Sequence, residues 1–208
     1  MIPDPTQVHP LPAHPRVVFL RNCVRSSRIV VGDFTYYDDP REAERFEENN
    51  VLYHYGPERL VIGKFCALAQ GVRFLMNGAN HRMSGISTYP FPIFGGVWAK
   101  HMDLVDDLPS RGDTIVGNDV WLGFESLVMP GVRIGDGAIV AARAVVAGEV
   151  RPYAVVAGNP ARELRRRFDD ATVERLLSIA WWNWPVEKIA RYARELMRAD
   201  VGALERAR

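Results

Sequence analysis

The chain has 208 residues, of which 48% are hydrophobic and 25% are charged, values that are ordinary for a globular protein and too apolar for a disordered one. Lys and Arg number 26 against 25 Asp and Glu, and this near-neutral balance argues against a nucleic-acid binder driven by bulk charge. Two cysteines, a start without a signal-peptide pattern and no apolar run of about 18 residues lead us to expect a cytoplasmic protein without a disulfide framework or a membrane span.

The first part of the chain carries little pattern. Residues 1–28 are treated as an N-terminal extension. The fragment from Val30 to Thr35 has the spacing of a first coil of the repeat described below, and residues 38–58 interrupt it. Within this interruption, the charged run from Pro40 to Phe46 predicts one or two helical turns.

Large apolar residues then recur at every sixth position. A first block contains Ile62, Leu68 and Phe74, and Cys66 takes the position two residues before Leu68. In a longer block the residues at this spacing are Val116, Leu122, Val128, Ile134, Val140 and Val146. A small or β-branched residue stands two positions before each of these, at Thr114, Val120, Ser126, Val132, Ala138 and Ala144.

A period of six excludes the two common patterns, because a helix repeats apolar residues every 3.6 positions and a strand repeats them every two. It indicates a parallel β-helix, in which three short faces form a coil of roughly 18 residues. The large residue of each hexad fills the apolar axis, and the small residue fits beside it. Cys66 occupies a small inward position, so we predict a buried filler rather than a reactive thiol.

Residues 77–113 break the repeat for longer than an ordinary connection, and a loop of this length in a compact domain is usually functional. The stretch from Tyr89 to Trp98 is apolar where a solvated loop would be polar, which is typical of an interface or a ligand surface. His81 lies where the loop leaves the scaffold, among Asn and Gly residues, and is the candidate for chemistry. His101 is expected to be an ordinary solvated side chain.

After residue 161 the pattern becomes helical. Val173, Leu176 and Trp181 lie on one helical face, with Asp169 placed to cap its start. A second helix is expected after Pro185. We expect these helices to close the open end of the β-helix. The chain therefore divides into an extension at 1–28, a β-helix domain at 29–161 with insertions at about 38–58 and 77–113, and a helical segment at 162–208.

Several of these segments, taken together, resemble one family. They are Ile62-Gly63-Lys64-Phe65-Cys66, Asn77 to Met83, Gly112 to Trp121 and Gly158-Asn159-Pro160-Ala161. This combination resembles the xenobiotic acetyltransferases, a hexapeptide-repeat family that holds the virginiamycin (streptogramin A) O-acetyltransferases and the type B chloramphenicol acetyltransferases. Within the family, Leu52-Tyr53-His54-Tyr55 and Trp98 to Met102 are similar to the streptogramin branch. The resemblance implies a left-handed β-helix.

The resemblance also implies an activity: O-acetylation of a streptogramin A antibiotic, which inactivates it, with acetyl-CoA as co-substrate and no metal. His81 matches the catalytic histidine of the family and would act as a general base. An imidazole with a pKa near 6.5 suits this role, and such a base typically contributes about 10²–10⁴-fold. Direct transfer without an acyl-enzyme is expected, and the sequence offers no plausible nucleophile, since Cys66 is predicted to be buried.

By the same resemblance, the acceptor contacts are Tyr37, Tyr53, Leu108 and Trp121. Packing at the edge of a coil face would explain Tyr37 and Trp121 equally well. The coenzyme is expected beside Gly123, Ala141, Ala142, Gly158, Pro160 and Arg165, although a solvated basic turn explains Arg165 as well. The family shares its sites between neighbouring subunits, so a homotrimer is expected, with no nucleic-acid or membrane partner.

Three alternatives stay open. A chloramphenicol or sugar O-acetyltransferase would keep the fold and change the acceptor, although the apolar loop disfavours a sugar. A metal enzyme of the β-helical carbonic anhydrase kind needs three histidine ligands, whereas His54, His81 and His101 are scattered over loops. A non-catalytic scaffold protein would keep the repeat without the chemistry.

Overall fold

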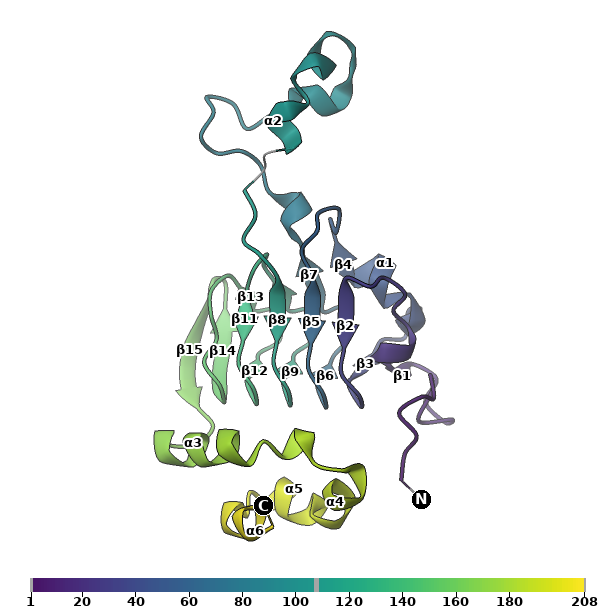
Figure 1. The fold of residues 1–208 in the computed structure, drawn as a ribbon, viewed down its shortest axis with the longest axis vertical. Coiled ribbons are helices and arrows are strands. Elements are labelled where there is room, and N and C mark those ends of the chain that lie inside the picture. Colours follow the sequence, from purple (N-terminus) through teal and green to yellow (C-terminus); the bar gives the residue numbers. More distant parts are fainter. Residues whose placement is uncertain (1, 107–108, 208) are drawn as a thin grey trace.

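The computed structural model describes residues 2–106 and 109–207 (Figure 1). Short strands wind into a coil with three sides, and each side builds one sheet. Sheet A contains β1 (Val17–Phe19), β3 (Tyr36–Asp38), β6 (Ala67–Leu68), β9 (Trp121–Leu122), β12 (Ile139–Val140), β14 (Ala154–Gly158) and β15 (Ala161–Arg166). Sheet B contains β2 (Ile29–Val31), β5 (Leu60–Ile62), β8 (Thr114–Val116) and β11 (Arg133–Ile134). Sheet C contains β4 (Val51–Leu52), β7 (Arg73–Leu75), β10 (Leu127–Val128) and β13 (Val145–Val146).

The chain visits the three sheets in a fixed order. From β8 in sheet B it passes to β9 in sheet A, then to β10 in sheet C, and returns to sheet B at β11. Successive coils pair in parallel and in register, so that Leu68 lies beside Leu122 and Leu122 beside Val140. This is the parallel β-helix that the six-residue period predicts, and it fits the left-handed winding that the family resemblance implies.

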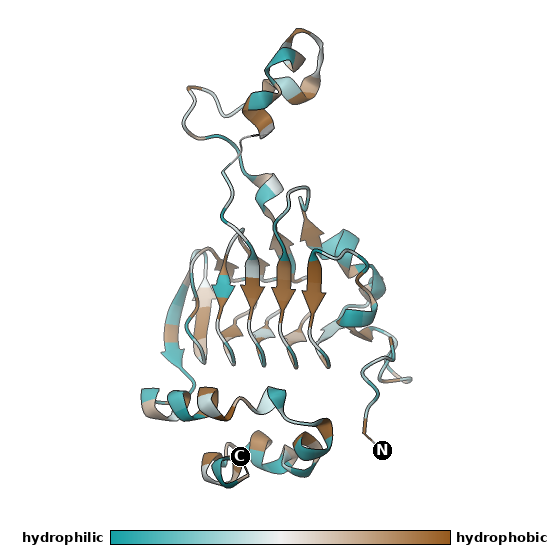
Figure 2. Ribbon diagram, in the orientation of Figure 1, coloured by the Kyte–Doolittle hydropathy of each residue, from teal (hydrophilic) through white to brown (hydrophobic). Residues whose placement is uncertain are grey.

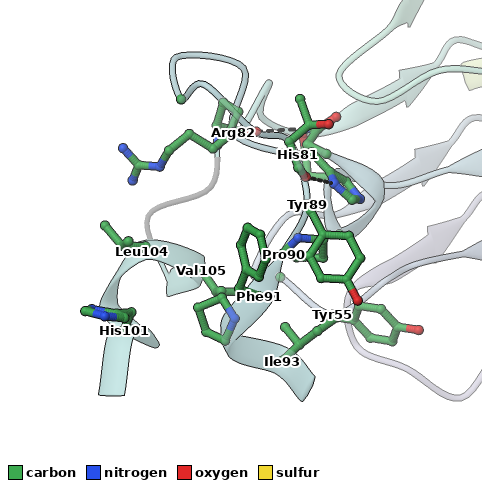
Figure 3. Close-up of a pocket in the computed structure, with 18 of the residues that line it drawn as sticks. Tyr55, His81, Arg82, Tyr89, Pro90, Phe91, Ile93, His101, Leu104 and Val105 are labelled. Carbon is green, nitrogen blue, oxygen red and sulfur yellow. Dashed lines mark hydrogen bonds between the residues drawn. The ribbon is translucent and has the colours of Figure 1, made fainter. Parts of the chain in front are cut away.

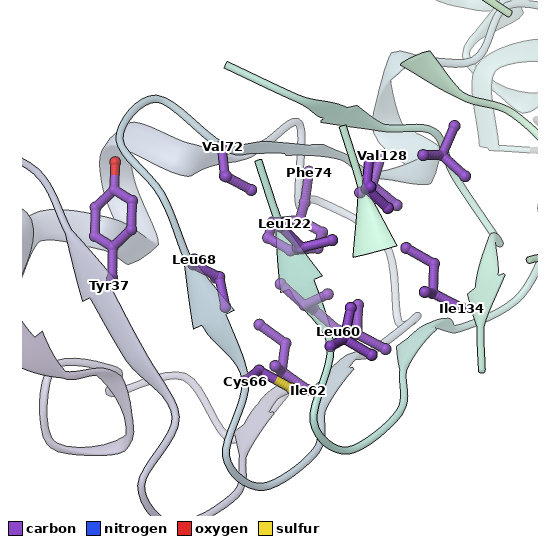
Figure 4. Close-up of a cluster of buried hydrophobic side chains, with 14 of the residues drawn as sticks. Tyr37, Leu60, Ile62, Cys66, Leu68, Val72, Phe74, Leu122, Val128 and Ile134 are labelled. Atoms are coloured by element: carbon purple, nitrogen blue, oxygen red, sulfur yellow. The ribbon is translucent and has the colours of Figure 1, made fainter. Parts of the chain in front are cut away.

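The core runs along the axis of the coil (Figure 4). Every sixth residue from Val116 to Val146 is at most 2% exposed, and the same holds for Ile62, Leu68 and Phe74. The small residues two positions earlier are buried as well. Both predicted inward positions are therefore confirmed, and they explain how strands of two or three residues stay stable: each contributes one side chain to a continuous apolar axis.

Cys66 is fully buried, as predicted, and burial raises the pKa of its thiol to about 12. A thiol reacts through its thiolate, so we expect Cys66 in the native protein to resist maleimide at pH 7 and to be labelled only after unfolding in urea. Mass spectrometry of the labelled peptides measures this, with the half-buried Cys23 as the internal comparison. Rapid stoichiometric labelling of native Cys66 would contradict the packing described here.

The turns that lead from sheet B to sheet A, called the B–A corner here, are built on stacked glycines. A Cβ atom on Gly63 would lie 2.5 Å from the carbonyl oxygen of Gly117 on the next coil, and one on Gly117 would lie 2.7 Å from the backbone nitrogen of Asp136. These atoms belong to the backbone or are fixed by it, so the coils can stack this closely only when no side chain stands between them.

Both outer edges of sheet A end in antiparallel strands. β1 pairs with β3, and β15 pairs with β14. The N-terminal extension thus supplies a strand of the body through Val17–Phe19. A free strand edge is a template for pairing with another chain. β1 covers the edge of β3, and β15 covers the edge of β14. The predicted helical turns near residue 40 are found slightly later, as a 3₁₀ turn over Ala43–Arg45 followed by α1 (Phe46–Asn50).

The C-terminal segment contains α3 (Asp170–Ile179), α4 (Val186–Arg191), α5 (Ala193–Arg198) and α6 (Val201–Arg206). Asp169 caps α3 as predicted, because its carboxylate accepts from the backbone N–H of Thr172 at 2.7 Å. The prediction that these helices close the end of the β-helix is wrong: they lie alongside the coils, below the strands in Figure 1. Across the described parts of the chain, no helix combines the length and apolar character that a bilayer crossing requires.

Aromatic packing explains this placement. The ring of Trp181 lies 5.0 Å from that of Phe65, which stands at the B–A corner of a central coil. Tyr153, at the same corner of the last coil, packs in one buried cluster with Val173 and Leu176 of α3. Two apolar contacts on distant coils thus fix the helices along the length of the body.

Asp119 stands at the B–A corner between β8 and β9, and its carboxylate lies 3.5 Å from the guanidinium of Arg167. Burial raises the pKa of Asp119 to about 6, because desolvation outweighs the attraction of Arg167. The native carboxyl binds a proton more tightly than the unfolded one, so its contribution to the free energy of unfolding grows as the pH falls from about 7 toward 4. We expect Asp119→Asn to raise the melting temperature most at pH 8 and clearly less at pH 5, where the native carboxyl is already mostly protonated. Equal shifts at both pH values would contradict this titration.

Candidate active site

The long insertion between β7 and β8 projects from the body (Figure 1). It contains 3₁₀ segments at Asn77–Ala79, Phe91–Phe94 and Gly96–His101, followed by α2 (Asp103–Asp106). Apolar stretches are visible within it in Figure 2, although it lies far from the core.

The projecting loop is ordered by its own aromatic cluster. The ring of Tyr89 lies 4.8 Å from Phe91 and stacks on Phe94 at 5.1 Å, and Phe91 meets Trp98 edge-on at 5.3 Å. Each of these four rings is nevertheless between 42% and 58% exposed. The cluster therefore holds the loop in shape while leaving an apolar surface available to a ligand or a partner.

A cleft of about 910 Å³ lies between this loop and the turn at residues 55–58 (Figure 3). This volume falls within the range of roughly 300–1,000 Å³ that is usual for small-molecule sites. Its wall includes Tyr55, His81, Tyr89, Phe91, Trp98 and His101. His101, predicted to be an ordinary solvated side chain, is thus placed on the same cleft as His81.

His81 is oriented by one hydrogen bond. Its Nδ1 lies 2.8 Å from the carbonyl oxygen of Thr88. A carbonyl oxygen can only accept, so Nδ1 carries the proton and donates it, and the neutral ring keeps a lone pair on Nε2. The loop thus fixes the tautomer that leaves Nε2 able to accept a proton.

Tyr37 lies inside the body and not on a ligand surface. It is 1% exposed, and its hydroxyl donates to Asp39 at 2.6 Å and accepts from the side chain of Asn50 at 2.8 Å. Burial and the bond to Asp39 raise the pKa of Tyr37 to about 12. The six-residue period explains this: Tyr37 stands six residues after the buried Val31, in the inward register. Its outward neighbour on the same strand is Tyr36, at 38% exposure.

The other predicted acceptor contacts lie in different parts of the structure. Tyr53 is 49% exposed, and its ring meets Tyr55 edge-on at 6.3 Å. The cleft itself is lined by Tyr55, which sequence reasoning did not single out although it stands in the same motif. Trp121 is 53% exposed on the outer face of sheet A. Leu108 lies outside the described residues.

The predicted coenzyme residues other than Arg165 lie where strands of sheet A end and the chain turns toward sheet C, called the A–C corner here, whereas Arg165 lies opposite Val155 near the start of β14. Gly123 follows β9, and a Cβ atom on it would lie 2.7 Å from the backbone nitrogen of Ala142, which follows β12. The N–H of Ala141 donates to Val156 of β14 at 2.9 Å. The remaining residues, Gly158, Pro160 and Arg165, lie in the exposed hairpin of β14 and β15.

The predicted residues therefore form two groups on one chain. His81 and Tyr53 follow strands of sheet C, at the corner that leads to sheet B. Trp121 and the coenzyme residues belong to sheet A and the A–C corner. The outer face of sheet A carries a row of partly exposed apolar residues in register: Tyr36, Ala67, Trp121, Ile139 and Val155. Among the described residues, no three His, Cys, Asp or Glu side chains are grouped so that they could hold a metal ion.

Several known proteins are similar in sequence to this chain over most of its length. Residues 113–148 match the family described as bacterial transferase hexapeptide (six repeats). A virginiamycin A acetyltransferase from Staphylococcus aureus is 44% identical over 208 residues, which cover 99% of this chain and 94% of that protein. A chloramphenicol acetyltransferase from Agrobacterium fabrum is 41% identical over 92% of each chain. A probable macrolide acetyltransferase from Lysinibacillus sphaericus is 51% identical over 73% of this chain and 85% of that protein.

Proposed function

This chain belongs to the hexapeptide-repeat acetyltransferases that include the virginiamycin A and chloramphenicol enzymes, and from that premise we propose that it acetylates a hydroxyl of streptogramin A antibiotics with acetyl-CoA. The observation that carries this proposal is the position of His81, whose Nε2 is available as a base on a large apolar cleft. A macrocyclic antibiotic offers the extended apolar surface that the exposed rings of the loop fit.

The reaction needs one base that moves a single proton. Nε2 of His81 takes the proton of the acceptor hydroxyl as the oxygen attacks the thioester carbonyl carbon. The resulting tetrahedral intermediate collapses, the carbon–sulfur bond breaks, and the proton passes from Nε2 to the departing thiolate. The carbonyl of Thr88 accepts from Nδ1–H throughout, which stabilises the imidazolium while it carries the extra proton.

The coenzyme is proposed to lie along the A–C corner. Gly123, Ala141, Ala142 and Gly158 leave room for a narrow pantetheine arm because none carries a side chain larger than a methyl group. Pro160 and Arg165 extend this surface along the last hairpin, and the exposed guanidinium of Arg165 suits the phosphates of the coenzyme.

A homotrimer would unite the two groups of residues. His81 and the coenzyme residues stand at different corners of the same prism, so one subunit would supply the histidine and its neighbour the A–C corner. The apolar row on the outer face of sheet A, with Trp121 at its centre, is then close to the shared site, and Trp121 and Tyr53 are proposed to contact the acceptor from opposite sides. Size-exclusion chromatography with light scattering tests the trimer, and a monomer at micromolar concentration would exclude it.

Chloramphenicol is the second candidate acceptor, because the Agrobacterium enzyme named for it matches this chain almost from end to end. We would measure thiol release from acetyl-CoA with virginiamycin M, chloramphenicol, a macrolide or a simple sugar as acceptor. Release with virginiamycin M alone is the expected result. Release with chloramphenicol alone would move the acceptor to the second candidate, and release with none of the four would overturn the proposed function.

A further inference from the structure

The projecting loop leaves and re-enters the body through two adjacent segments, called the roots here: residues 77–80 on the way out and 109–112 on the way back. The side chain of Asn77 joins them. It is 6% exposed, its Oδ1 accepts from the backbone N–H of Arg111 at 2.8 Å, and its Nδ2 donates to the carbonyl of Gly112 at 3.0 Å. The amide thus imitates a rung of β-sheet between two segments that form no sheet.

Asn80 makes a second connection beside the first. Its Nδ2 donates to the carbonyl of Pro109 at 2.8 Å and to Oδ1 of Asn77 at 3.2 Å. Asn80 immediately precedes His81. The peptide that carries the imidazole is therefore tied to the returning root directly through Asn80 and indirectly through Asn77.

Each root also rests on the scaffold. The N–H of Gly78 donates to the carbonyl of Tyr53 at 3.1 Å, and a Cβ atom on Gly78 would collide with that carbonyl. On the returning side, a Cβ atom on Gly131 would collide with the carbonyl of Arg111. The outgoing root is thus seated beside the end of β4 and the returning root beside the end of β10, with the coil of β7 between them, and the Asn77 amide fixes the distance between the roots.

We propose that Asn77 is a positioning residue for the reaction: it holds His81 at the height above the coils at which Nε2 meets the acceptor hydroxyl. This inference rests on the proposed function, in which His81 is the base. An asparagine is required because the position needs one donor and one acceptor on a short side chain. An aspartate keeps the acceptor, loses the donor to Gly112 and turns a carboxylate oxygen toward that carbonyl.

The test compares Asn77→Ala and Asn77→Asp with a matched control, Asn118→Ala. Asn118 also accepts from a backbone N–H, that of Lys64 at 2.9 Å, and also donates, to Asp136 at 2.8 Å, but it stands at the B–A corner away from the loop. Its removal costs a comparable set of hydrogen bonds without touching the roots. The melting temperature, kcat and both KM values are measured for each variant.

We expect kcat to fall about tenfold to a hundredfold in Asn77→Ala, the scale on which a base displaced by about 1 Å loses efficiency, and to fall less in Asn77→Asp. The KM for acetyl-CoA should change by less than about twofold, because the coenzyme residues stand at another corner. Asn118→Ala should lower the melting temperature with kcat retained. An unchanged kcat in Asn77→Ala, or an equal loss in Asn118→Ala, would overturn the proposal.

Amide hydrogen exchange separates this inference from the proposed function. The Arg111 amide and the segment around His81 should exchange slowly in the wild type and at least about tenfold faster in Asn77→Ala. Without the hydrogen bonds of the Asn77 side chain, the two roots open more often. Unchanged exchange at both places would overturn the proposal even for a protein that acetylates none of the acceptors. Turnover by the wild type combined with unchanged Asn77 variants would refute only the role of Asn77.

Discussion

His81→Ala is expected to lower kcat by about 10²-fold or more, because the acceptor hydroxyl would then lose its proton to water instead of to a fixed imidazole. Thiol release from acetyl-CoA at saturating acceptor measures this. The melting temperature and the oligomeric state should stay those of the wild type, since His81 is exposed and its hydrogen bond lies within the loop. The substitution should lower kcat more than it changes either KM, because the imidazole accepts the proton in the transition state and is not needed to bind the substrates.

The control for this variant is His14→Ala, which removes an imidazole from the N-terminal segment and should leave the rate unchanged. Full activity in His81→Ala would exclude the imidazole from the mechanism and return the choice of base to the other groups on the cleft, His101 first. A loss of activity together with a loss of folded protein would show a structural role for His81 instead, which its exposed position opposes.

The largest effect on stability is expected from Gly63→Ala. The added methyl group would stand 2.5 Å from the carbonyl oxygen of Gly117, and neither coil can withdraw without breaking the parallel pairing of β5 and β8. We expect a loss of about 3 kcal/mol in the free energy of unfolding, at the upper end of overpacking effects, measured by urea denaturation.

Gly148→Ala is the matched control, because nothing lies within 4 Å of the position that its Cβ would take. The two substitutions add the same atoms and differ only in what those atoms meet. If both variants unfold at the same urea concentration, the close stacking of the coils at the B–A corner is not what limits stability.

Much of the fold could be predicted because the repeat is local. The spacing from Val116 to Val146 alone identifies the large and the small inward positions, and all of them are buried. The same rule, carried back from Val31, places Tyr37 inside. The family resemblance implies an acceptor contact at Tyr37, whereas the side chain is 1% exposed, as the period requires.

The parts that could not be predicted depend on contacts between distant residues. The C-terminal helices lie alongside the coils because Trp181 meets Phe65, and no local pattern links residues more than a hundred positions apart. Likewise, the sequence indicates His81 as the base but not that Thr88 selects its tautomer, since that depends on the path of the loop. The position of Tyr55 on the cleft likewise depends on the path of the loop, which no local pattern gives.

The place where the loop is inserted has a consequence for engineering. The loop starts after β7 and ends at β8, and one coil later the chain makes the same turn from β10 to β11 with only residues 129–132. β7 pairs in parallel with β10, and β8 pairs in parallel with β11, so the long and the short connection join the same two sheets. The winding therefore does not depend on what is inserted between β7 and β8. We therefore expect the projecting segment to be exchangeable between relatives: transplanting it should transfer the part of the acceptor preference that the loop wall of the cleft sets, while Tyr53 and Trp121 stay with the scaffold.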